Sequence, residues 1–425
     1  MRVYITVMYI FFCCVRRIYC SSSDCKSVED TYDAESCKLF WDCTSKGLLR
    51  PVNRSIFRES LGELDIEKIG HTPLWLRIHS GKLYCVVHPG FVKKKYRLKI
   101  YRAAHYINRL NRVLSQRKFW IPSGTEWWTH YSDLVKVAPD NTSPPIFATS
   151  GAHGSADIAG IPFMSFSDKK SQHENRAFQK LEKDPTFYSN WAKKKKVAYF
   201  RGALSDCADA VSKHAGDLKF CARAKVIYHA VNSQDPLLSG ISSSSEFRET
   251  GMSVDCKRCR TLSITSEEFV TNLLTHRYVL DFAGAGSWSR RMSLLLRSGS
   301  LIFQSESRGY QFYEFALQPG VHYIPFDPEI GKSGSGTLLS RLRWAQNNDR
   351  IAERIARRAQ SFGSFCLAES SIDYFVSKLL TEYSNFLRGN SIPYPLVDLS
   401  CCSSHKNTPF KLSRQCSDAI EKCWG

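Results

Sequence analysis

YVLDFAGAGSWSRRMSLLLRSGSLIFQSESRGYQFYEFALQPGVHYIPF, residues 278–326, is the stretch that decides the fold class. Its first residues, 278–282, form a short apolar run before a glycine-rich turn, which predicts a buried strand. Apolar residues then recur at helical spacing over 288–297, so we expect a helix that packs on a sheet. Ser298 and Gly299 mark the end of that helix.

Two further strands are expected in this stretch, over 300–304 and 323–326. The order strand, glycine turn, helix, strand is that of a βαβ unit, so the sequence predicts an α/β fold with a parallel sheet. In such sheets a ligand binds at the carboxyl ends of the strands. The turn after the first strand is therefore a candidate ligand site.

Residues of that turn and of the helix start are suited to an anion. Gly284 and Gly286 leave backbone N–H groups open where the helix begins, and an anion is stabilised there. Arg290 and Arg291 place two cations against the helix dipole in the first turn. Since this placement is unfavourable for the helix, we expect an anionic ligand, with a diphosphate the obvious candidate. For Arg290 alone, a solvated surface charge is the favoured interpretation.

The same stretch resembles the CAP10-like O-glycosyltransferases, glycosyltransferase family 90. The matching elements are Ser289-x-Arg291, Arg297-Ser298-Gly299-Ser300-Leu301 and Leu317-x-Pro319-x-Val321-His322-Tyr323-Ile324-Pro325. A weaker resemblance runs from about Cys37 to Leu387. Animal members of this family use UDP-sugars to O-glucosylate or O-xylosylate serines of EGF-like repeats, and the resemblance implies an inverting transfer of this kind.

The resemblance also implies a GT-B-like fold, in which two Rossmann-like domains enclose a cleft and C-terminal helices pack back on the N-terminal half. A chain of 425 residues is long enough for two or three domains. We expect a signal peptide at 1–20, an acceptor-side domain with a Cys-rich start at 21–190 and a nucleotide-sugar-binding domain at 191–365. A closing helix and a Cys-rich tail are expected at 366–425.

Composition indicates the secretory pathway. Residues 3–15 are almost wholly apolar but too few to span a bilayer as a helix, which favours a signal peptide. The 16 cysteines would mostly form disulfides in an oxidising compartment. We expect the cysteine clusters at 25–43 and 401–423 to form disulfides that hold peripheral segments of the chain in place. Asn53 and Asn141 stand in glycosylation sequons. The endoplasmic reticulum lumen is the expected location, with the Golgi or secretion as alternatives because no KDEL-type ending is present.

A net charge of +19 is suited to binding one of several partners, namely nucleic acid, acidic glycans, a membrane surface or a nucleotide donor. A secretory route argues against nucleic acid. The resemblance instead implies two partners, a UDP-sugar donor and a secreted or membrane protein acceptor such as an EGF-like repeat.

On the donor side, a strand expected at 197–200 ends in Arg201 and Gly202. Gly202 permits close approach of the backbone, and Arg201 can bind phosphate through two parallel hydrogen bonds. Arg223 matches a later arginine of the family. The resemblance implies that these residues bind the UDP-sugar together with Gly284, Gly286, Ser289 and Arg291. Members that O-glucosylate carry a Ser-Arg pair after the Arg-Gly, but residues 203–206 read ALSD here, so part of that phosphate clamp is missing.

The candidate catalytic base is Asp133. Residues 126–133 keep the family's spacing Glu-Phe-x-x-Asn-x-x-Asp, with His130 in place of the asparagine. In the family that aspartate takes the proton of the acceptor hydroxyl, a step that is needed because a serine hydroxyl is a poor nucleophile. A strand-end cap is the alternative role for Asp133, and Asp140 is the second candidate base.

No metal and no other cofactor is expected. Family members stabilise the leaving group with arginines and helix N-terminal amides. Cys256 and Cys259 have C-x-x-C spacing but no second pair at zinc-ribbon distance, so disulfides are favoured over a metal site. His322 is interpreted as a core or supporting residue.

Other segments carry simpler expectations. We expect a hairpin over 74–87 and an amphipathic helix within 91–118 whose basic outer face is solvated. Lys193 to Lys196 are expected to form an exposed segment that precedes the next strand. Residues 232–263 are expected to form a loop.

Helices are expected again in the later part of the chain. One covers 266–275, with Ser266 as its N-cap. The pattern from 338 to 387 is also helical, and the resemblance places these helices against the N-terminal half. Apolar residues expected to share one buried stripe are Trp344, Ile351, Ile355, Ala359 and Phe362.

Two other classes of function stay open. A dinucleotide enzyme would use the glycine turn 284–286 after a strand, with the acidic Glu306 further along the chain. The third glycine position of that fingerprint holds Ser289, which weakens it. The other class is a secretory binding protein that keeps the fold and has lost catalysis, favoured by the missing clamp residues and the altered surroundings of Asp133.

Overall fold

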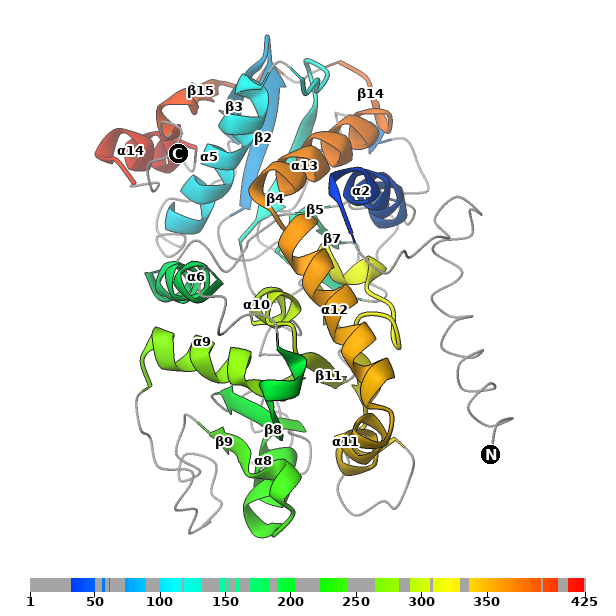
Figure 1. Cartoon of the computed structure of the whole chain (residues 1–425). Coiled ribbons are helices and arrows are strands. Elements are labelled where there is room, and N and C mark those ends of the chain that lie inside the picture. Colours follow the sequence, from blue (N-terminus) through cyan, green and yellow to red (C-terminus); the bar gives the residue numbers. More distant parts are fainter. Residues whose placement is uncertain are drawn as a thin grey trace.

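The computed structural model describes residues 32–49, 56–57, 61, 73–88, 100–116, 118–131, 146–149, 151–152, 157–160, 169–182, 190–202, 222–243, 264–282, 291–305, 309–328, 336–390, 393–403 and 412–423. Figure 1 shows two lobes, each built around a β-sheet and bordered by helices. Several positions singled out in the sequence lie outside the described residues, namely the signal peptide at 1–20, Asn53, Asp133, Asp140, Asn141, Cys256, Cys259, Gly284, Gly286, Ser289, Arg290 and Glu306.

The described helices are α2 (Ala34–Leu49), α5 (Ile100–Ser115), α6 (Lys169–Glu182), α8 (Ala222–Asn232), α9 (Ser266–Thr275), α10 (Met292–Arg297), α11 (Leu338–Asn347), α12 (Asp349–Phe365), α13 (Glu369–Ser384) and α14 (Arg414–Lys422). Short 3-10 helices are η2 (Trp191–Lys193), η4 (Pro236–Leu238), η7 (Glu314–Ala316) and η8 (Ser400–Cys402).

One lobe contains a five-stranded sheet in which every neighbouring pair is parallel. Its strands are β8 (Lys195–Gly202), β9 (Gly240–Ser243), β10 (His276–Asp281), β11 (Leu301–Ser305) and β13 (Ile324–Phe326). β10 is buried along its whole length, as is typical of a parallel strand covered on both faces. The parallel α/β unit predicted from the central stretch is thereby confirmed.

The strand order across this sheet is β13-β11-β10-β8-β9. The chain runs from β8 to β9 on one side, then returns and continues outward from β10 on the other. The direction of winding therefore reverses between β8 and β10. A crevice opens at the carboxyl ends of the strands at such a reversal, and ligands bind there in sheets of this kind.

Alternate residues of these strands face two hydrophobic cores, because successive strand side chains point to opposite faces of a sheet. Phe200, Tyr278 and Leu280 lie in the core shared with α8 and α11. Tyr199 and Val279 lie in the other core, shared with α9 and α10. That second core continues into the other lobe, so the two lobes are packed together through apolar side chains.

The other lobe contains a six-stranded mixed sheet of order β15-β3-β2-β4-β5-β7. Its strands are β2 (Pro73–His79), β3 (Lys82–Val86), β4 (Glu126–His130), β5 (Ile146–Ala148), β7 (Asp157–Ala159) and β15 (Leu396–Asp398). β4, β5 and β7 are parallel, whereas β2, β3 and β15 pair antiparallel. The hairpin predicted over 74–87 is confirmed, and it gives this half an antiparallel edge that a wholly parallel Rossmann-like sheet lacks.

The C-terminal helices connect the lobes. α12 packs on α10 and β11 in the parallel-sheet lobe, and α13 then packs against α2 and α5 in the other lobe (Figure 1). A short strand pair adds to this connection, β6 (Gly151–Ala152) with β12 (Gly309–Tyr310). Another short pair, β1 (Ile56–Phe57) with β14 (Leu387–Arg388), lies after the end of α13. The prediction that C-terminal helices pack back on the N-terminal half is confirmed.

Disulfides join distant parts of the chain. Cys37 in α2 pairs with Cys366 after α12, and Cys85 in β3 pairs with Cys423 after α14, at sequence separations of 329 and 338 residues. A third bridge, between Cys402 and Cys416, is local to the tail. The expectation that the terminal cysteine clusters only staple peripheral segments is therefore wrong for Cys37 and Cys423.

Two basic segments are less exposed than the sequence suggested. Lys194 is buried, and its ammonium donates to Leu274 O at 2.6 Å, Ser298 O at 3.0 Å and Ser300 Oγ at 2.9 Å. The expectation of an exposed run over 193–196 is therefore wrong for Lys194, because three oxygens at the ends of α9 and α10 replace its hydration.

The basic face of α5 is likewise not wholly solvated. Arg109 is buried and donates to Asp373 at 3.2 Å and to Glu369 at 2.9 Å. Arg112 reaches Asp373 as well, with Nη2 2.6 Å from a carboxylate oxygen. These ion pairs hold α5 against α13, and they correct the expectation of a solvated outer face.

Three further features differ from expectation, namely a strand, a helix N-cap and the exposure of one side chain. A strand, β9, interrupts the loop expected over 232–263. The N-cap of α9 is Thr265, not Ser266, because Thr265 and Glu268 form a reciprocal capping box. Ile351 is 46% exposed and does not share the buried stripe of α12. The end predicted for α10 is confirmed, with Gly299 at φ 64° after the helix.

Membrane-spanning helices were searched for across the described part of the chain. None of its helices is both long enough and apolar enough to cross a bilayer.

Candidate donor-binding site

The candidate site lies at the carboxyl ends of β8, β9 and β10. β8 ends in Arg201 and Gly202, which stand in register with Ser242 and Ser243 of β9. Asp281 is the last residue of β10 and is 2% exposed. These strand ends border the winding reversal, so they meet at the crevice expected to hold a ligand.

Two arginines, Arg223 and Arg291, lie beside the buried ring of Phe200 in β8. The Arg291 guanidinium carbon lies 4.6 Å from the ring centroid and that of Arg223 lies 6.0 Å from it. Phe282, which follows β10, packs edge-on against the same ring, with centroids 4.8 Å apart. Arg201 directly follows Phe200 in the strand, so its side chain points to the opposite face of the sheet. Phe200 therefore gathers two cations, one from α8 and one from the start of α10.

Hydrogen bonds fix each of these arginines to the strand ends. Arg201 Nη1 donates to Ser242 Oγ at 3.3 Å, and Arg223 Nη2 donates to the Phe282 carbonyl at 3.0 Å. Arg291 Nη2 donates to the Arg201 carbonyl at 3.3 Å. A guanidinium carries five N–H donors, so one such bond orients it and is compatible with two parallel bonds to a phosphate.

Gly202 is required by the close approach of Arg291. A Cβ atom at position 202 would stand 2.5 Å from Arg291 Nη2 and 2.9 Å from Phe200 Cζ. A larger residue would push the guanidinium away from the end of β8. The local role of Gly202 is therefore to admit an arginine, whereas the sequence suggested approach of a ligand.

Three arginines stand at these strand ends, and Asp281 is the one carboxylate among the described residues there. Burial raises the pKa of Tyr199 to about 12, although the charges of Arg201 and Arg291 act to lower it. Tyr199 is thus a neutral phenol at physiological pH and does not offset the arginines. The arrangement is suited to binding an anion.

Four of the predicted site residues are brought together by the fold, namely Arg201, Gly202, Arg223 and Arg291. Sequence reasoning did not find Phe200, Ser242 or Asp281 as neighbours of that set. Asp281 stands at a strand end before a glycine turn, which was a usable signal. Ser242 was missed because β9 has only four residues and was taken for loop.

In the mixed-sheet lobe, the described residues reach Tyr131, two positions before the candidate base Asp133. β4, which leads to it, is wholly buried. Glu126 in β4 accepts from Arg77 Nε at 2.6 Å, and this buried ion pair ties β4 to β2. His130 is fully buried at the end of the strand.

His322 is a core residue, as predicted. The Gln318 N–H donates to its Nδ1 at 3.0 Å, so Nε2 carries the ring hydrogen and donates to Tyr32 Oη at 2.6 Å. Burial and the charge of Arg358 lower the pKa of His322 to about 3. The residue joins the segment before α2 to the loop before β13 and does not reach the strand ends.

Groups able to hold a metal ion were sought among the residues that the structure describes. No cluster of three or more His, Cys, Asp or Glu side chains is found there. The guanidinium groups of the candidate site can bind a phosphate by direct hydrogen bonds.

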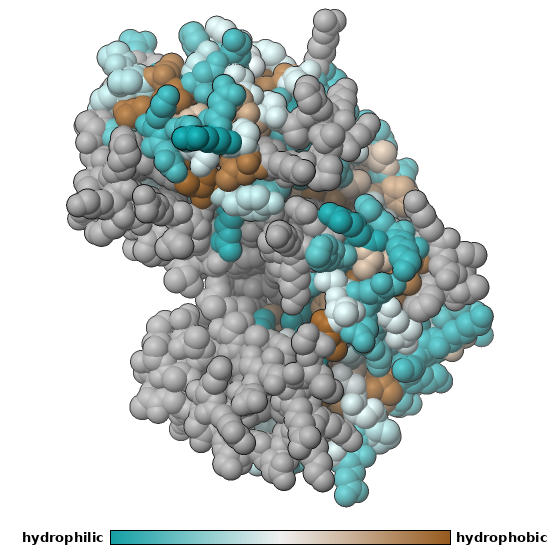
Figure 2. Space-filling model, turned by 90° about the vertical axis from the view of Figure 1, so that its left-hand side faces the viewer, coloured by the Kyte–Doolittle hydropathy of each residue, from teal (hydrophilic) through white to brown (hydrophobic). Residues whose placement is uncertain are grey.

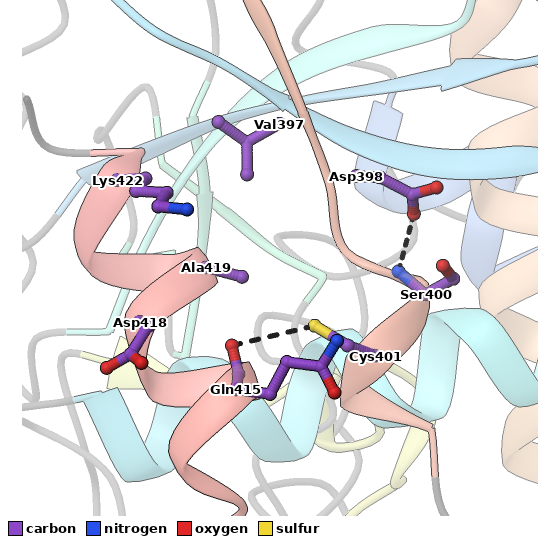
Figure 3. Close-up of a pocket in the computed structure, with 8 residues that line it drawn as sticks. All are labelled: Val397, Asp398, Ser400, Cys401, Gln415, Asp418, Ala419 and Lys422. Carbon is purple, nitrogen blue, oxygen red and sulfur yellow. Dashed lines mark hydrogen bonds between the residues drawn. The ribbon is translucent and has the colours of Figure 1, made fainter.

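On the face shown in Figure 2, hydrophilic and hydrophobic side chains of the described residues are interspersed. A separate cavity of about 380 Å³ lies in the tail between β15 and α14 (Figure 3). Cys401 lines it, with Sγ 3.8 Å from the Gln415 carbonyl. Burial and the nearby Asp398 carboxylate raise the pKa of this thiol, which keeps it protonated and unsuited to a catalytic nucleophile.

Comparison with known proteins identifies the family. The zebrafish (Danio rerio) protein O-glucosyltransferase 2 is 34% identical over 109 residues, 26% of this chain and 21% of that protein. The mouse (Mus musculus) protein O-glucosyltransferase 1 is 34% identical over 115 residues, 27% of this chain and 28% of that protein. The mouse protein O-glucosyltransferase 3 is 28% identical over 127 residues, 28% of this chain and 24% of that protein.

These alignments span about a quarter of the length of the curated relatives. The sequence model of glycosyl transferase family 90 covers much more of the chain, matching residues 73–401. That span contains the mixed sheet, the parallel sheet and the three arginines Arg201, Arg223 and Arg291. The chain belongs to glycosyl transferase family 90.

Proposed function

We propose that this protein is an inverting, UDP-sugar-dependent O-glycosyltransferase. It transfers glucose or xylose to a serine hydroxyl of a protein acceptor, such as an EGF-like repeat. The observation that carries the proposal is the convergence of Arg201, Arg223 and Arg291 at the winding reversal of the parallel sheet. The two lobes act as the halves of a GT-B-like enzyme, with the donor on the parallel-sheet lobe and the acceptor on the other.

The arginines assist departure of UDP. As the bond between the sugar C1 and the phosphate oxygen breaks, negative charge grows on the diphosphate. Cations fixed in advance by Phe200 and the strand ends stabilise that charge more in the transition state than in the bound donor. Gly284, Gly286 and Ser289 contribute polar contacts to the same diphosphate, so the departure of UDP needs no metal ion.

The acceptor is activated by Asp133. Its carboxylate takes the serine proton while the hydroxyl oxygen attacks C1 on the face opposite to UDP. Attack from that face inverts the configuration at C1. The buried β4 holds the segment that leads to Asp133, and a fixed base is what general-base catalysis requires.

The secretory pathway is the proposed location, with the endoplasmic reticulum lumen favoured. Support comes from the three bridges Cys37–Cys366, Cys85–Cys423 and Cys402–Cys416, which form and persist in oxidising compartments.

A catalytically inactive binding protein is the second candidate. Residues 203–206, ALSD, favour it, since relatives that O-glucosylate carry a phosphate-clamp arginine there. Family membership favours either of these over a dinucleotide enzyme.

Transfer from a panel of UDP-sugars to a folded EGF-like repeat tests the proposal. With Asp133 as the base, Asp133→Asn keeps UDP affinity and lowers transfer by roughly two to four orders of magnitude. Since His130 lies close in the chain, the double variant with His130→Ala is measured too. Transfer that survives in both variants would move the base elsewhere, with Asp140 the next to test. Absence of transfer with every donor, alongside tight UDP binding, would favour the binding protein.

A further inference from the structure

α12 carries a line of arginines on the side opposite to its buried face. The buried residues are Ala352, Ile355, Ala356, Ala359, Phe362 and Gly363. Arg350, Arg354 and Arg357 are exposed and follow the spacing i, i+4, i+7. At 3.6 residues per turn they fall within an arc of about 60° and extend over about 10 Å. We call these three residues the arginine stripe.

Few acidic side chains neutralise the positive charge of the arginine stripe. Arg357 pairs with Glu353 of the same helix, with atoms 2.6 Å apart. Asp349, the other acid of the helix, is engaged by Arg277 at 2.8 Å. No ion pair is found for Arg350 or Arg354 with any residue in the described part of the chain. Because like charges four residues apart destabilise a helix, the placement of Arg350 and Arg354 does not serve the stability of α12.

We propose that the arginine stripe binds a linear anionic polysaccharide that carries sulfate or carboxylate groups. Guanidinium groups bind planar or tetrahedral oxyanions through parallel hydrogen bonds, and arginine is more weakly hydrated than lysine. A straight row of cations on a rigid helix presents successive sites to a chain with regularly spaced anions. This binding is separate from sugar transfer and does not rest on the proposed function.

Other polyanions and partners fit the stripe less well. A stable protein interface is centred on large anchoring side chains packed in pockets, and Ile351 is the one large apolar side chain exposed beside the stripe among the described residues of α12 before Phe365. The apolar face of α12 packs on α10, β11 and α2, so the helix has no free face to insert into a bilayer. A disulfide-forming compartment disfavours nucleic acid.

Heparin binding by the full chain tests the proposal. The stripe variant combines Arg350→Gln, Arg354→Gln and Arg357→Gln, since glutamine keeps helix propensity close to that of arginine. The matched control combines Lys46→Gln, Lys180→Gln and Arg414→Gln, which removes the same charge from exposed positions elsewhere. The dissociation constant is measured over a series of NaCl concentrations, and anionic and neutral phospholipid vesicles are assayed in parallel.

The stripe variant should bind heparin about tenfold or more weakly, and its slope of log affinity against log salt should fall by about three, one for each contact. The control should keep the wild-type slope. Equal losses in both variants, or none in the stripe variant, would overturn the proposal. So would loss of vesicle binding with unchanged heparin binding, which would assign the stripe to a membrane surface. An unchanged or higher thermal midpoint of the stripe variant excludes unfolding as the cause of any loss.

Discussion

At the scale of single residues, the buried His322 makes the stability of the fold depend on pH. Protonation of its Nδ1 would set an N–H against the N–H of Gln318, and burial together with Arg358 lowers its pKa to about 3. The unfolded chain binds this proton near pH 6.5. The contribution of His322 to stability is therefore fully present above pH 6.5 and is lost as the pH falls toward 3.

Lowering the pH from 7 to 5 should cost about 2 kcal/mol of unfolding free energy through His322. Urea unfolding at both pH values, in the wild type and in His322→Gln, measures this cost. The variant should show a pH dependence weaker by that amount. A dependence that is the same in both proteins would assign the proton uptake to other groups.

Lys194 shows which residue-scale features were beyond sequence analysis. Four consecutive lysines at 193–196 suggest a solvated run, and the structure agrees for Lys193, Lys195 and Lys196, which are exposed. The difference at Lys194 depends on two helix ends, α9 and α10, that lie 80 and 104 residues further along the chain. Local patterns carry no information on such partners.

At the scale of elements, the crossing of α10 and α12 depends on Gly363. A Cβ atom there would lie 2.7 Å from the Leu296 carbonyl carbon and 2.9 Å from the Arg297 nitrogen. Both are backbone atoms of α10, so the helices would have to separate. The contact explains a glycine in the interior of a helix, where it otherwise costs about 1 kcal/mol relative to alanine.

Gly363→Ala should destabilise the protein by about 1–3 kcal/mol, because the strain of overpacking exceeds the gain in helix propensity. Gly336→Ala is the matched control, since its added Cβ would meet a single atom at 4.0 Å. Chemical denaturation compares the two. Stabilisation by Gly363→Ala would show that the helices are not packed as closely as described.

Sequence analysis predicted long, strongly patterned elements better than short or charged ones. Four of the five parallel strands, the hairpin and the closing helices were anticipated from their apolar patterns and turn residues. β9 was missed because four residues, GISS, contain too little pattern to distinguish a strand from a loop. The face of α5 was taken as solvated because Asp373 and Glu369, which neutralise it, belong to α13.

At the scale of the whole molecule, the bridge between Cys37 and Cys366 fastens α2 to the end of α12. It closes a loop of more than 300 residues, with a sequence separation of 329. Replacing both cysteines by alanine should cost about 2–5 kcal/mol, mainly by releasing the unfolded chain. Unfolding under non-reducing conditions measures the cost, with Cys401→Ala as control because this thiol is free. Equal stability of the two variants would contradict a structural role for the bridge.

The whole-molecule architecture was predictable only in outline. The α/β class and the return of the C-terminal helices followed from the sequence and from the family resemblance. The pairing of β15 with β3 and the partners of Cys37 and Cys423 did not, because such pairings join residues hundreds of positions apart. For the site, four of the predicted donor residues converge, and Phe200, which gathers two of their charges, could be recognised only in three dimensions.

The central claim is that a nucleotide diphosphate binds at the arginines around Phe200. Calorimetric titration of UDP into the full chain and into Arg291→Ala tests it most directly, with Arg297→Ala as control at the far end of α10, where Arg297 contacts Asn175. The wild type and the control should bind UDP equally, and Arg291→Ala should bind it more weakly by about 1.5–3 kcal/mol, as for a lost charge-assisted hydrogen bond. A wild-type chain that does not bind UDP, or a folded Arg291→Ala variant with unchanged affinity, would contradict the account.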